Sequence, residues 1–407
     1  MDILRRVQRG AFASHVLGSS LSPFSPQDKG FITDVVYGTL RQQIYLDACL
    51  KPNLKRPDKL PEDVRNALRA GTYELLLRGT PRHAGVGEWV SVVKKKQPRL
   101  AGLVNAVLRK VEPLPNPTPS ELASVPDWLY EDWRTLFGDK AAEVAKGMLE
   151  PEPLWLSVYD ERAADSLENE GCTVASGPLD NTLAIKPSRP LNELSAFKKG
   201  WIQPQNPSSR EPVLALNVKA DERVLDLASG NGIKAAQLAN MGANVVSVEI
   251  DTAKVERAKA NLGRLGLKVE HHVHDLTKKL GLEPALKVLL DAPCSGTGTL
   301  RGHPEIKLRL EPKDVSELAA LQAKLLTNSA ELCSPGGTLV YAVCALTSQE
   351  SITCINAFLE THPDFKVDPY EAKLPHLQTP QGSFILPTDG LDGFFISVLK
   401  QTATHQK

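Results

Sequence analysis

The C-terminal half of the chain alternates short apolar runs with helical segments, and this alternation restricts the possible folds more than any other feature. The apolar runs predict strands at residues 223–227, 244–248, 269–273, 288–290 and 338–343. Strands separated by helices form a mostly parallel, doubly wound sheet. We therefore expect an α/β Rossmann-like domain over residues 203–402. A last strand at residues 394–399 is expected to add at the edge of the sheet.

The N-terminal part shows helical periodicity and almost no strand signal, which predicts an all-α bundle over residues 1–115. Prolines recur through residues 113–119 and are typical of a stiff linker. Mixed strand and helix signals follow, and predict a small α+β module over residues 120–202, which contains further helices at 121–149. Helices of the bundle are expected at residues 3–17, 26–49, 61–78, 84–96 and 98–112.

The cysteine content argues against a disulfide framework and a structural zinc site. The chain has 6 cysteines and no C-x-x-C pair, which favours a reducing compartment. His271, His272 and His274 would point to alternate faces of a strand, so no metal is expected. No stretch reaches the apolar length of a membrane span, and Met1–Ser20 lacks the apolar core of a signal peptide. We expect a cytoplasmic protein that has no membrane partner and is a monomer, although the sequence does not determine the oligomeric state.

The charges are unevenly distributed although the net charge is zero. Residues 1–120 contain 19 Lys and Arg against 10 Asp and Glu, which leaves 29 against 38 for the rest. A basic module joined to an acidic one suggests that the first binds a polyanion. The alternative is a solvated helical face without a partner. The candidate RNA contacts are Lys94, Lys95, Lys96, Arg99, Arg301, His303 and Lys307.

Two cysteines follow predicted strands of the C-terminal domain. Cys294 lies in the segment Asp291-Ala-Pro-Cys-Ser-Gly-Thr-Gly298, and Cys344 lies in Tyr341-Ala-Val-Cys344. Open α/β sheets place their chemistry at the carboxyl ends of the strands. Two thiols in one crevice suggest covalent catalysis assisted by a second sulfur or acid. The alternative is a pair of buried structural cysteines, because free cysteine is often a small core residue.

The end of the first predicted strand has the features of a nucleoside site. Glycines let the backbone approach a ligand at a helix N-terminus, and the acid that ends the next strand, Glu249, suits a ribose. The loop lacks the full G-x-G-x-x-G pattern, so S-adenosylmethionine is expected rather than a dinucleotide. An ordinary strand-to-helix turn is the alternative. The candidate cofactor residues are Asp226, Ala228, Ser229, Gly230, Asn231, Gly232, Lys234, Glu249 and Asp275, the last expected at the adenine edge.

These motifs resemble those of the RsmB/NOP/NSUN family of RNA cytosine-5 methyltransferases. The Cys294 segment followed by Arg301-x-His-Pro-Glu-Ile-Lys307 is similar to the family's fourth motif. Pro335–Cys344 resembles the sixth motif, and Asp392–Phe395 and Gln203–Ser209 resemble its closing strand and its entry segment. The helical part, with Phe31–Arg41 and Leu103–Arg109, is similar to the NusB-like domain of the bacterial RsmB (Fmu/Sun) branch. The resemblance covers nearly the whole chain.

The resemblance implies a reaction and a role for each site residue. Cys344 would add to carbon 6 of a cytosine, so that carbon 5 becomes nucleophilic, and Cys294 would assist breakdown of the covalent adduct. Asp291 would hydrogen-bond the cytosine edge and also belong to the cofactor site. The implied cofactor is S-adenosylmethionine and the implied partner is 16S ribosomal RNA, free or partly assembled. Transfer RNA as the substrate, or a non-catalytic RNA-binding assembly factor, are the alternatives.

The chain departs from the family pattern at several positions. Ile233 replaces a glycine of the cofactor loop, and Val343 and Ala345 replace hydroxyl residues beside Cys344. Asn206 and Ser351 stand where Asp and Asn are common. Because the two cysteines, Asp291, Lys234 and the acids of the cofactor site are all present, the sequence predicts a divergent but active enzyme.

Overall fold

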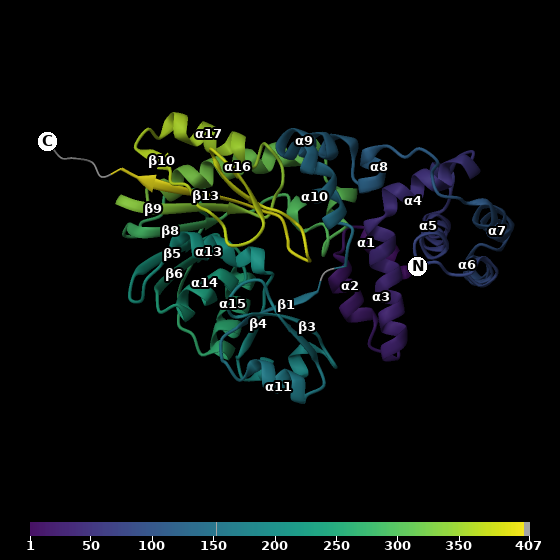
Figure 1. The fold of residues 1–407 in the computed structure, drawn as a ribbon, viewed down its shortest axis with the longest axis horizontal. Coiled ribbons are helices and arrows are strands. Elements are labelled where there is room, and N and C mark those ends of the chain that lie inside the picture. The colour runs from purple at the N-terminus through teal and green to yellow at the C-terminus, as the bar shows by residue number, and fades with distance from the viewer. Residues whose placement is uncertain (152, 403–407) are drawn as a thin grey trace. The chain divides into compact units, whose positions relative to one another are not determined.

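The computed structural model describes residues 1–151 and 153–402, which form two compact units (Figure 1). The helical unit comprises Met1–Glu150 and Leu300–Arg309. The catalytic unit, named for the site described below, comprises Pro151–Thr299 and Leu310–Lys407, of which 403–407 lie outside the described residues. The helices of the helical unit are α1 (Asp2–Gln8), α2 (Ala13–Ser20), α3 (Pro26–Arg41), α4 (Gln43–Leu50), α5 (Glu62–Leu76), α6 (Arg82–Lys96), α7 (Ala101–Lys110), α8 (Pro119–Ala123), α9 (Asp127–Phe137) and α10 (Ala141–Gly147).

Helix α5 lies at the centre of the helical unit and contacts α3, α4, α6 and α7. Its Leu68 is fully buried together with Val104 and Leu108 of α7. Helix α3 approaches α5 closely because Gly38 has no side chain: a Cβ at this position would lie 2.0 Å from the Tyr73 ring. Burial of these apolar faces, rather than helix propensity alone, stabilises the bundle.

The expected helices exist, but two of them are each divided in the structure. The helix predicted at 3–17 becomes α1 and α2, because the chain turns at Gly10, whose φ is +111°. The helix predicted at 26–49 becomes α3 and α4, which are separated by Gln42 with φ −100° and ψ 8°. The helix predicted at 98–112 starts with a 3₁₀ turn at Pro98–Leu100. Helical periodicity does not reveal such breaks, since the apolar face continues on both sides.

The catalytic unit begins with a small antiparallel sheet of four strands in the order β2-β3-β1-β4. Leu156, Leu167, Leu194 and Ile202 form its fully buried core. The strands and helices of this part are β1 (Leu154–Val158), α11 (Ala163–Asn169), β2 (Thr173–Ser176), β3 (Thr182–Lys186), α12 (Ser195–Lys198) and β4 (Ile202–Pro204).

A nine-stranded mixed sheet forms the rest of the catalytic unit, with the order β11-β12-β13-β9-β8-β5-β6-β7, and β10 paired with β13. Helices α13, α14 and α15 lie on one side of the sheet, and α16 and α17 lie on the other (Figure 1). The elements are α13 (Glu211–Leu216), β5 (Arg223–Leu227), α14 (Ile233–Asn240), β6 (Asn244–Glu249), α15 (Thr252–Leu265), β7 (Glu270–Val273), β8 (Ala285–Asp291), α16 (Pro312–Ala330), β9 (Cys333–Val343), α17 (Ile352–Thr361), β10 (Phe365–Val367), β11 (His376–Thr379), β12 (Gly382–Ile385) and β13 (Phe394–Gln401).

The predicted Rossmann-like arrangement is confirmed. Strands β5, β6, β7, β8 and β9 are parallel, and the chain changes its direction of travel across the sheet at β5, which pairs with both β6 and β8. Ligands of open α/β sheets bind outside the carboxyl ends of the strands at such a switch point. Both cysteine segments leave strands on the same side of this point, Cys294 after β8 and Cys344 after β9.

The prediction that the last strand lies at the edge of the sheet is wrong. Strand β13 is antiparallel to β9 on one side and to β12 and β10 on the other. Six of its eight residues, Phe394–Leu399, are buried, which is typical of a strand covered on both faces. The hairpin β11–β12, which the sequence did not reveal, takes the edge position instead.

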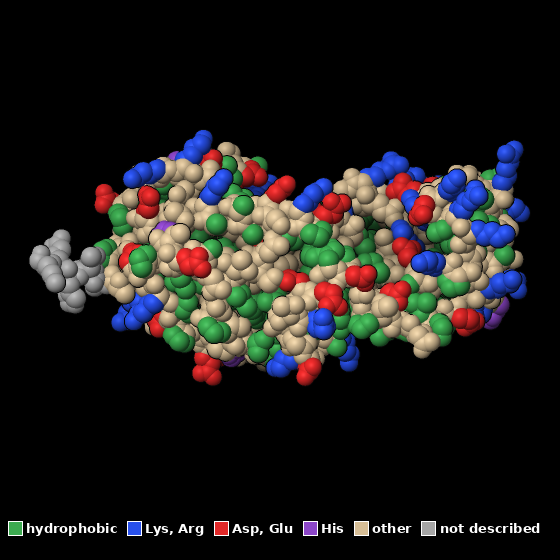
Figure 2. All heavy atoms as spheres, turned by 90° about the horizontal axis from the view of Figure 1, so that it is seen from above, with side chains coloured by type: hydrophobic (Ala, Val, Ile, Leu, Met, Phe, Trp, Pro, Cys, Tyr) green, Lys and Arg blue, Asp and Glu red, His purple; other side chains and the backbone are tan. Residues whose placement is uncertain are grey.

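The contacts place helices α8, α9 and α10 in the helical unit, not with the strands that follow them. Because the structure divides into two contact units and not three, it does not test the division into domains at 1–115, 120–202 and 203–402, which stays a prediction. Figure 2 shows Lys and Arg side chains gathered over the helical unit, in agreement with its basic composition. Among the described residues, no helix has both the length and the apolar character needed to cross a membrane.

Candidate active site

The thiols of Cys294 and Cys344 lie side by side at the carboxyl ends of β8 and β9. Their sulfur atoms are 3.3 Å apart, and both residues are free cysteines of intermediate exposure. The neighbouring Cys344 sulfur, followed by burial, raises the pKa of Cys294 well above its ordinary value. Cys294 is therefore held as a neutral thiol beside a second sulfur. The structure brings together the two residues that the sequence placed at one edge of the sheet.

Backbone hydrogen bonds fix the two cysteine segments to each other. The Gly298 N–H donates to the Cys344 carbonyl at 2.9 Å, and the Gly298 carbonyl accepts from the Gly393 N–H at 2.8 Å. A Cβ at Gly298 would lie 2.0 Å from the Gly393 carbonyl oxygen, so only glycine fits there. The Thr297 hydroxyl accepts from the Leu346 N–H at 2.8 Å. The sulfur pair is thus held by a rigid frame that joins β8, β9 and β13.

A buried carboxylate that the sequence analysis missed supports both cysteine segments. Glu350 is fully buried and accepts hydrogen bonds from the Ser295 N–H at 2.8 Å and from the Thr347 hydroxyl at 2.8 Å. The Gln322 amide donates to it at 3.0 Å. Ser295 follows Cys294, and Thr347 lies three residues after Cys344. The available signal for Glu350 was an acid within a turn that is largely buried. A buried charge requires several hydrogen-bond partners.

Lys234 and Asp291 form an ion pair beside the cysteines. The Lys234 ammonium, at the start of α14, lies 2.6 Å from the Asp291 carboxylate and 3.2 Å from the Ser209 hydroxyl. Burial alone would lower the pKa of Lys234, but Asp291 and, more weakly, Cys344 raise it. A positive charge therefore lies within electrostatic reach of the Cys344 sulfur. Ser209 is a further residue of this site that the sequence analysis did not assign.

The predicted cofactor loop follows β5 and takes left-handed backbone conformations. Ala228, Gly230 and Gly232 have φ values of +58°, +56° and +74°. A Cβ at Gly232 would lie 2.8 Å from the Ala258 Cβ, so glycine lets the loop pack on α15, whereas a Cβ at Gly230 would meet nothing within 4 Å. Ile233, the departure from the family pattern, is the first residue of α14. The loop therefore keeps an open backbone at Gly230.

Two buried acids next to this loop fit a nucleoside that carries a positive charge. Both oxygens of Asp226 are buried without a partner in hydrogen-bond geometry among the described residues, although the Ala235 N–H lies close enough to lower its pKa weakly. Glu249 accepts from the Gly230 N–H at 2.8 Å and from the Asp251 N–H at 2.9 Å. Each carboxylate oxygen has a second lone pair, so Glu249 can also accept from ribose hydroxyls. The unsatisfied Asp226 carboxylate is the observation that favours a ligand here.

We expect the substitution Asp226→Asn to change the pH dependence of stability. Burial, followed by the Asp291 carboxylate, raises the pKa of Asp226 to about 7. Between about pH 4 and this value the folded protein binds a proton that the unfolded chain has released, so stability falls as the pH rises. The variant should gain about 2–4 kcal/mol at about pH 8 and nothing at about pH 4, measured by urea denaturation. Parallel pH profiles of the two proteins would contradict this assignment.

Three other predicted cofactor residues make contacts of their own. The Asn231 side chain accepts from Arg257 at 3.0 Å, and the Ser229 hydroxyl lies 3.1 Å from that of Ser247. The Asp275 carboxylate accepts hydrogen bonds from the hydroxyl and the backbone N–H of Thr277. These two bonds are the main reason why the pKa of Asp275 is lowered. Asp275 is thus ionised just beyond β7, and its contact with an adenine stays a prediction.

The candidate RNA contacts fall into two groups. Lys94, Lys95, Lys96 and Arg99 are exposed at the end of α6 and in the turn that follows, and His303 is partly exposed. Arg301 and Lys307, in contrast, are 1% and 2% exposed. Arg301 lies 3.8 Å from Glu150, and the Lys307 ammonium donates to the Arg41 carbonyl at 2.6 Å. We therefore correct the expectation that these two cations contact RNA, because both are used within the helical unit.

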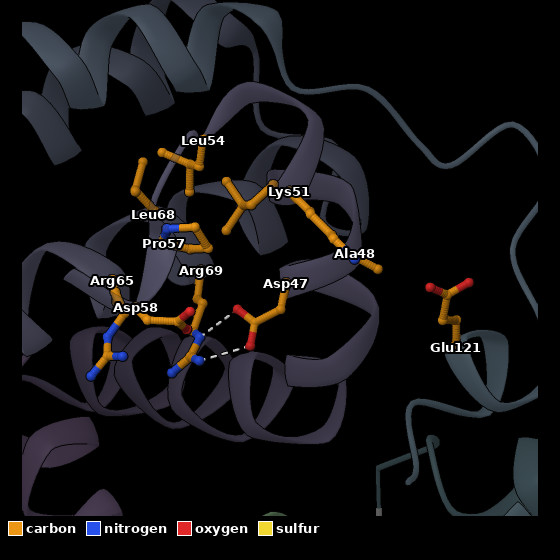
Figure 3. A pocket seen from close by; sticks show the side chains of 11 residues that line it. Asp47, Ala48, Lys51, Leu54, Pro57, Asp58, Arg65, Leu68, Arg69 and Glu121 are labelled. Carbon is orange, nitrogen blue, oxygen red and sulfur yellow. Dashed lines mark hydrogen bonds and ion pairs between the residues drawn. The ribbon is translucent and has the colours of Figure 1, made fainter. Parts of the chain in front are cut away.

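A cavity of about 380 Å³ opens in the helical unit between α4, α5 and α8 (Figure 3). Its apolar wall includes Leu54 and Leu68, and the Arg69 guanidinium forms two hydrogen bonds of 2.7 Å with Asp47 at its floor. None of the residues predicted for catalysis, cofactor or RNA binding lines this cavity. It therefore adds nothing to the site around Cys294 and Cys344.

Comparison with known proteins extends over the whole chain. A family described as 16S rRNA methyltransferase RsmB/F matches residues 213–400, and the NusB family matches residues 1–113. The ribosomal RNA small subunit methyltransferase B of Thermus thermophilus is 42% identical over 401 residues, which cover 98% of this chain and 96% of that protein. The probable methyltransferase B of Bacillus subtilis is 32% identical, with 98% and 97% covered. The crystal structure of PH0851 is 25% identical, with a TM-score of 0.82 and with 98% and 97% covered.

The doubly wound sheet and the full-length similarity define an S-adenosylmethionine-dependent methyltransferase. The chain belongs to the family of ribosomal RNA small subunit methyltransferases B. This confirms the predicted family, the NusB-like helical domain at the N-terminus, and the methyltransferase domain at the C-terminus. S-adenosylmethionine, the predicted cofactor, is the cofactor of this family.

Proposed function

We propose that this protein methylates carbon 5 of a cytosine in 16S ribosomal RNA through a covalent intermediate at Cys344. The observation that carries the proposal is the sulfur pair: Cys294 and Cys344 lie 3.3 Å apart at the ends of two adjacent parallel strands. A single buried thiol could be structural. Two thiols at the carboxyl ends of the strands, next to the switch point, fit a reaction that makes and then breaks a carbon–sulfur bond. The relatives' names support ribosomal RNA as the substrate.

In the first step Cys344 acts as the nucleophile. Its thiolate adds to carbon 6 of the cytosine, and the electron pair of the carbon 5–carbon 6 double bond moves to carbon 5. The Lys234 ammonium, whose pKa is raised in part by Cys344, stabilises the thiolate before the attack. Asp291 shares one carboxylate oxygen with Lys234 and is partly exposed, so its remaining oxygen can hydrogen-bond the cytosine edge. The base must leave its stack to enter the site.

Bound S-adenosylmethionine supplies the electrophilic methyl group. Asp226 and Glu249 are the acids that would hold its charged and ribose parts, at the loop whose open backbone is at Gly230. Because Lys234 is already paired with Asp291, it acts on the thiolate and the base rather than primarily on the cofactor. In this proposal Asp226 and Glu249 act on the cofactor, and Lys234 acts on Cys344 and the cytosine.

In the last step Cys294 assists the release of Cys344. Carbon 5 loses its proton, the double bond to carbon 6 re-forms, and the carbon–sulfur bond breaks. Cys294 is a neutral thiol next to the departing sulfur, because Cys344 and burial raise its pKa. It can donate its proton to the departing Cys344 sulfur and take up the proton from carbon 5. Cys344 then releases its proton to solvent, which restores the starting thiolate and accounts for the proton that the methyl group replaces.

The test is to incubate the protein with unmodified 16S ribosomal RNA and labelled S-adenosylmethionine, and to map 5-methylcytosine at nucleotide resolution. We expect 5-methylcytosine at one cytosine, or at a small number of them. Label on another base would reject the chemistry, and label only on transfer RNA in a parallel reaction would reject the substrate. Calorimetry that detects no cofactor binding at millimolar concentration would favour a non-catalytic assembly factor instead.

A further inference from the structure

The segment Leu300–Arg309, here called the anchored segment, follows the Cys294 motif in the sequence but belongs to the helical unit. The chain leaves the catalytic unit after Thr299, five residues beyond Cys294, and returns at Leu310. Five of the ten residues of the anchored segment are buried and Arg309 is exposed, while Leu308 packs against the apolar cluster of Leu4, Val7 and Leu40. Part of the helical unit's own core is therefore supplied by the methyltransferase sequence.

Polar side chains of the anchored segment form hydrogen bonds with the ends of three helices of the helical unit. The N-terminus of α2 has no side-chain cap from its N-cap residue, Phe12, and the Glu305 carboxylate accepts from the Ala13 N–H at 3.0 Å. Glu305 is fully buried, and its pKa, which burial alone would raise, is lowered overall by the nearby His303 and by backbone N–H groups. A negative charge at a helix N-terminus is stabilising.

The opposite helix ends are bonded by two basic side chains, Arg309 and Lys307, and burial lowers the pKa of Lys307 to about 7. The Arg309 guanidinium donates to the Val7 carbonyl near the C-terminus of α1 and, at 3.0 and 2.6 Å, to the carbonyls of Gly10 and Ala11 in the next turn. The Lys307 ammonium donates to the carbonyl of Arg41, the last residue of α3. Cations suit helix C-termini because the last carbonyls are unpaired there. Three ends of α1, α2 and α3 are thus closed by residues about 260 to 300 positions further along the chain.

The same peptide carries Cys294 at its other end. The turn Thr297–Thr299 directly precedes Leu300, and within it Gly298 bonds to the Cys344 and Gly393 backbones. The peptide that follows Cys294 is therefore bonded to the frame of the sheet at Gly298 and, further along, to α1 and α2 through the anchored segment. We propose that Arg309 and Glu305 are positioning residues, which hold the Cys294 loop by anchoring the peptide that follows it to α1 and α2.

This inference rests on the proposed role of Cys294 in releasing Cys344. Reacting groups displaced by about 1 Å can lose on the order of a hundredfold in rate. A loosened anchor should therefore slow the release of RNA more than the binding of RNA. The helical unit then contributes to the chemical cycle through the anchored segment, in addition to any contact that its basic surface makes with RNA.

The test compares Arg309→Met with Arg134→Met in the full-length protein. Arg134 is an exposed arginine of α9 in the same unit that pairs with Glu131. For Arg309→Met we expect kcat to fall about tenfold with KM within about twofold, and protein–RNA adduct to build up in denaturing gels. Arg134→Met should match the unmodified protein. Arg309→Lys keeps the cation and should recover at least about half of the lost rate.

A second measurement needs neither RNA nor cofactor. Iodoacetamide alkylates the Cys294 sulfur with loss of iodide, and peptide mass spectrometry follows this reaction separately from that of Cys344. We expect the alkylation rate of Cys294 to rise about fivefold in Arg309→Met, because local opening exposes the loop. If Arg309→Met does not fold, Glu305→Gln and Arg309→Lys, which preserve side-chain size, carry the same measurement.

The outcomes separate this inference from the proposed function. A kcat and a Cys294 alkylation rate equal to those of Arg134→Met would overturn the positioning role. If the unmodified protein forms no 5-methylcytosine but Arg309→Met still accelerates Cys294 alkylation, the proposed function fails and the anchoring of the loop stands. If only the melting temperature changes, Arg309 is structural and the inference is wrong.

Discussion

Replacing Cys344 by alanine is expected to abolish methylation of ribosomal RNA. In the proposed cycle the Cys344 sulfur forms the bond to carbon 6 of the cytosine. Without this bond carbon 5 is not nucleophilic enough to react. Loss of a nucleophile in other enzymes lowers the rate by several orders of magnitude, so we expect a decrease of at least about a thousandfold. The measurement is the initial rate of transfer of labelled methyl groups to 16S ribosomal RNA.

Cys333→Ala provides a matched control for this substitution. Cys333 is a buried cysteine at the start of β9, the strand whose other end leads to Cys344. Removing its sulfur should cost some stability but leave the rate per folded molecule within about twofold, because large-to-small changes in a core mainly create a cavity. A Cys344→Ala variant that retains the rate of Cys333→Ala would contradict covalent catalysis by Cys344.

Replacing Cys294 by alanine is expected to trap the protein on its RNA. The Cys344 thiolate and the Lys234 ammonium remain in this variant, so addition to the cytosine should still proceed. The proton donor 3.3 Å from the departing sulfur is lost, so release should become slow. We expect a covalent protein–RNA band in denaturing gels and a turnover at least about a hundredfold lower, in the range that general acid–base groups contribute.

The double variant Cys294→Ala/Cys344→Ala is the control, and it should show no band. A band that persists in the double variant would mean that another residue binds the RNA. A Cys294→Ala variant that turns over at the normal rate without a band would remove the proposed division of roles between the two thiols.

Sequence patterns located the sheet and the active site where local chemistry determines both. Strand β5 has the predicted bounds, because a short apolar run between a polar turn and a glycine loop has few other structures available. The cysteine pair could be predicted because strand ends bring distant residues together. The Lys234–Asp291 pair connects two predicted residues, although their 2.6 Å contact depends on the packing of α14 against β5.

Other features depend on contacts that local patterns do not contain. Strand β13 lies inside the sheet because β12 of the hairpin β11–β12 pairs with it, and the sequence did not reveal that hairpin. Arg301 and Lys307 look like RNA-binding cations in the sequence, but the Arg301 side chain pairs with Glu150 and the Lys307 ammonium donates to the carbonyl of Arg41 at the end of α3. The roles of Glu350 and Ser209 could not be predicted, because they depend on their hydrogen bonds to Ser295 and Lys234. Most of these contacts join residues that are far apart in the sequence.

The most direct test uses RNA in which the target cytosine is replaced by 5-fluorocytosine. Fluorine at carbon 5 cannot leave as a proton does, so a true intermediate stops as a stable adduct after methyl transfer. Digestion of the adduct and mass spectrometry should place the nucleotide on the peptide that contains Cys344, and only when S-adenosylmethionine is present. A nucleotide on Cys294, or no adduct from RNA that the protein demonstrably binds, would contradict the proposed mechanism.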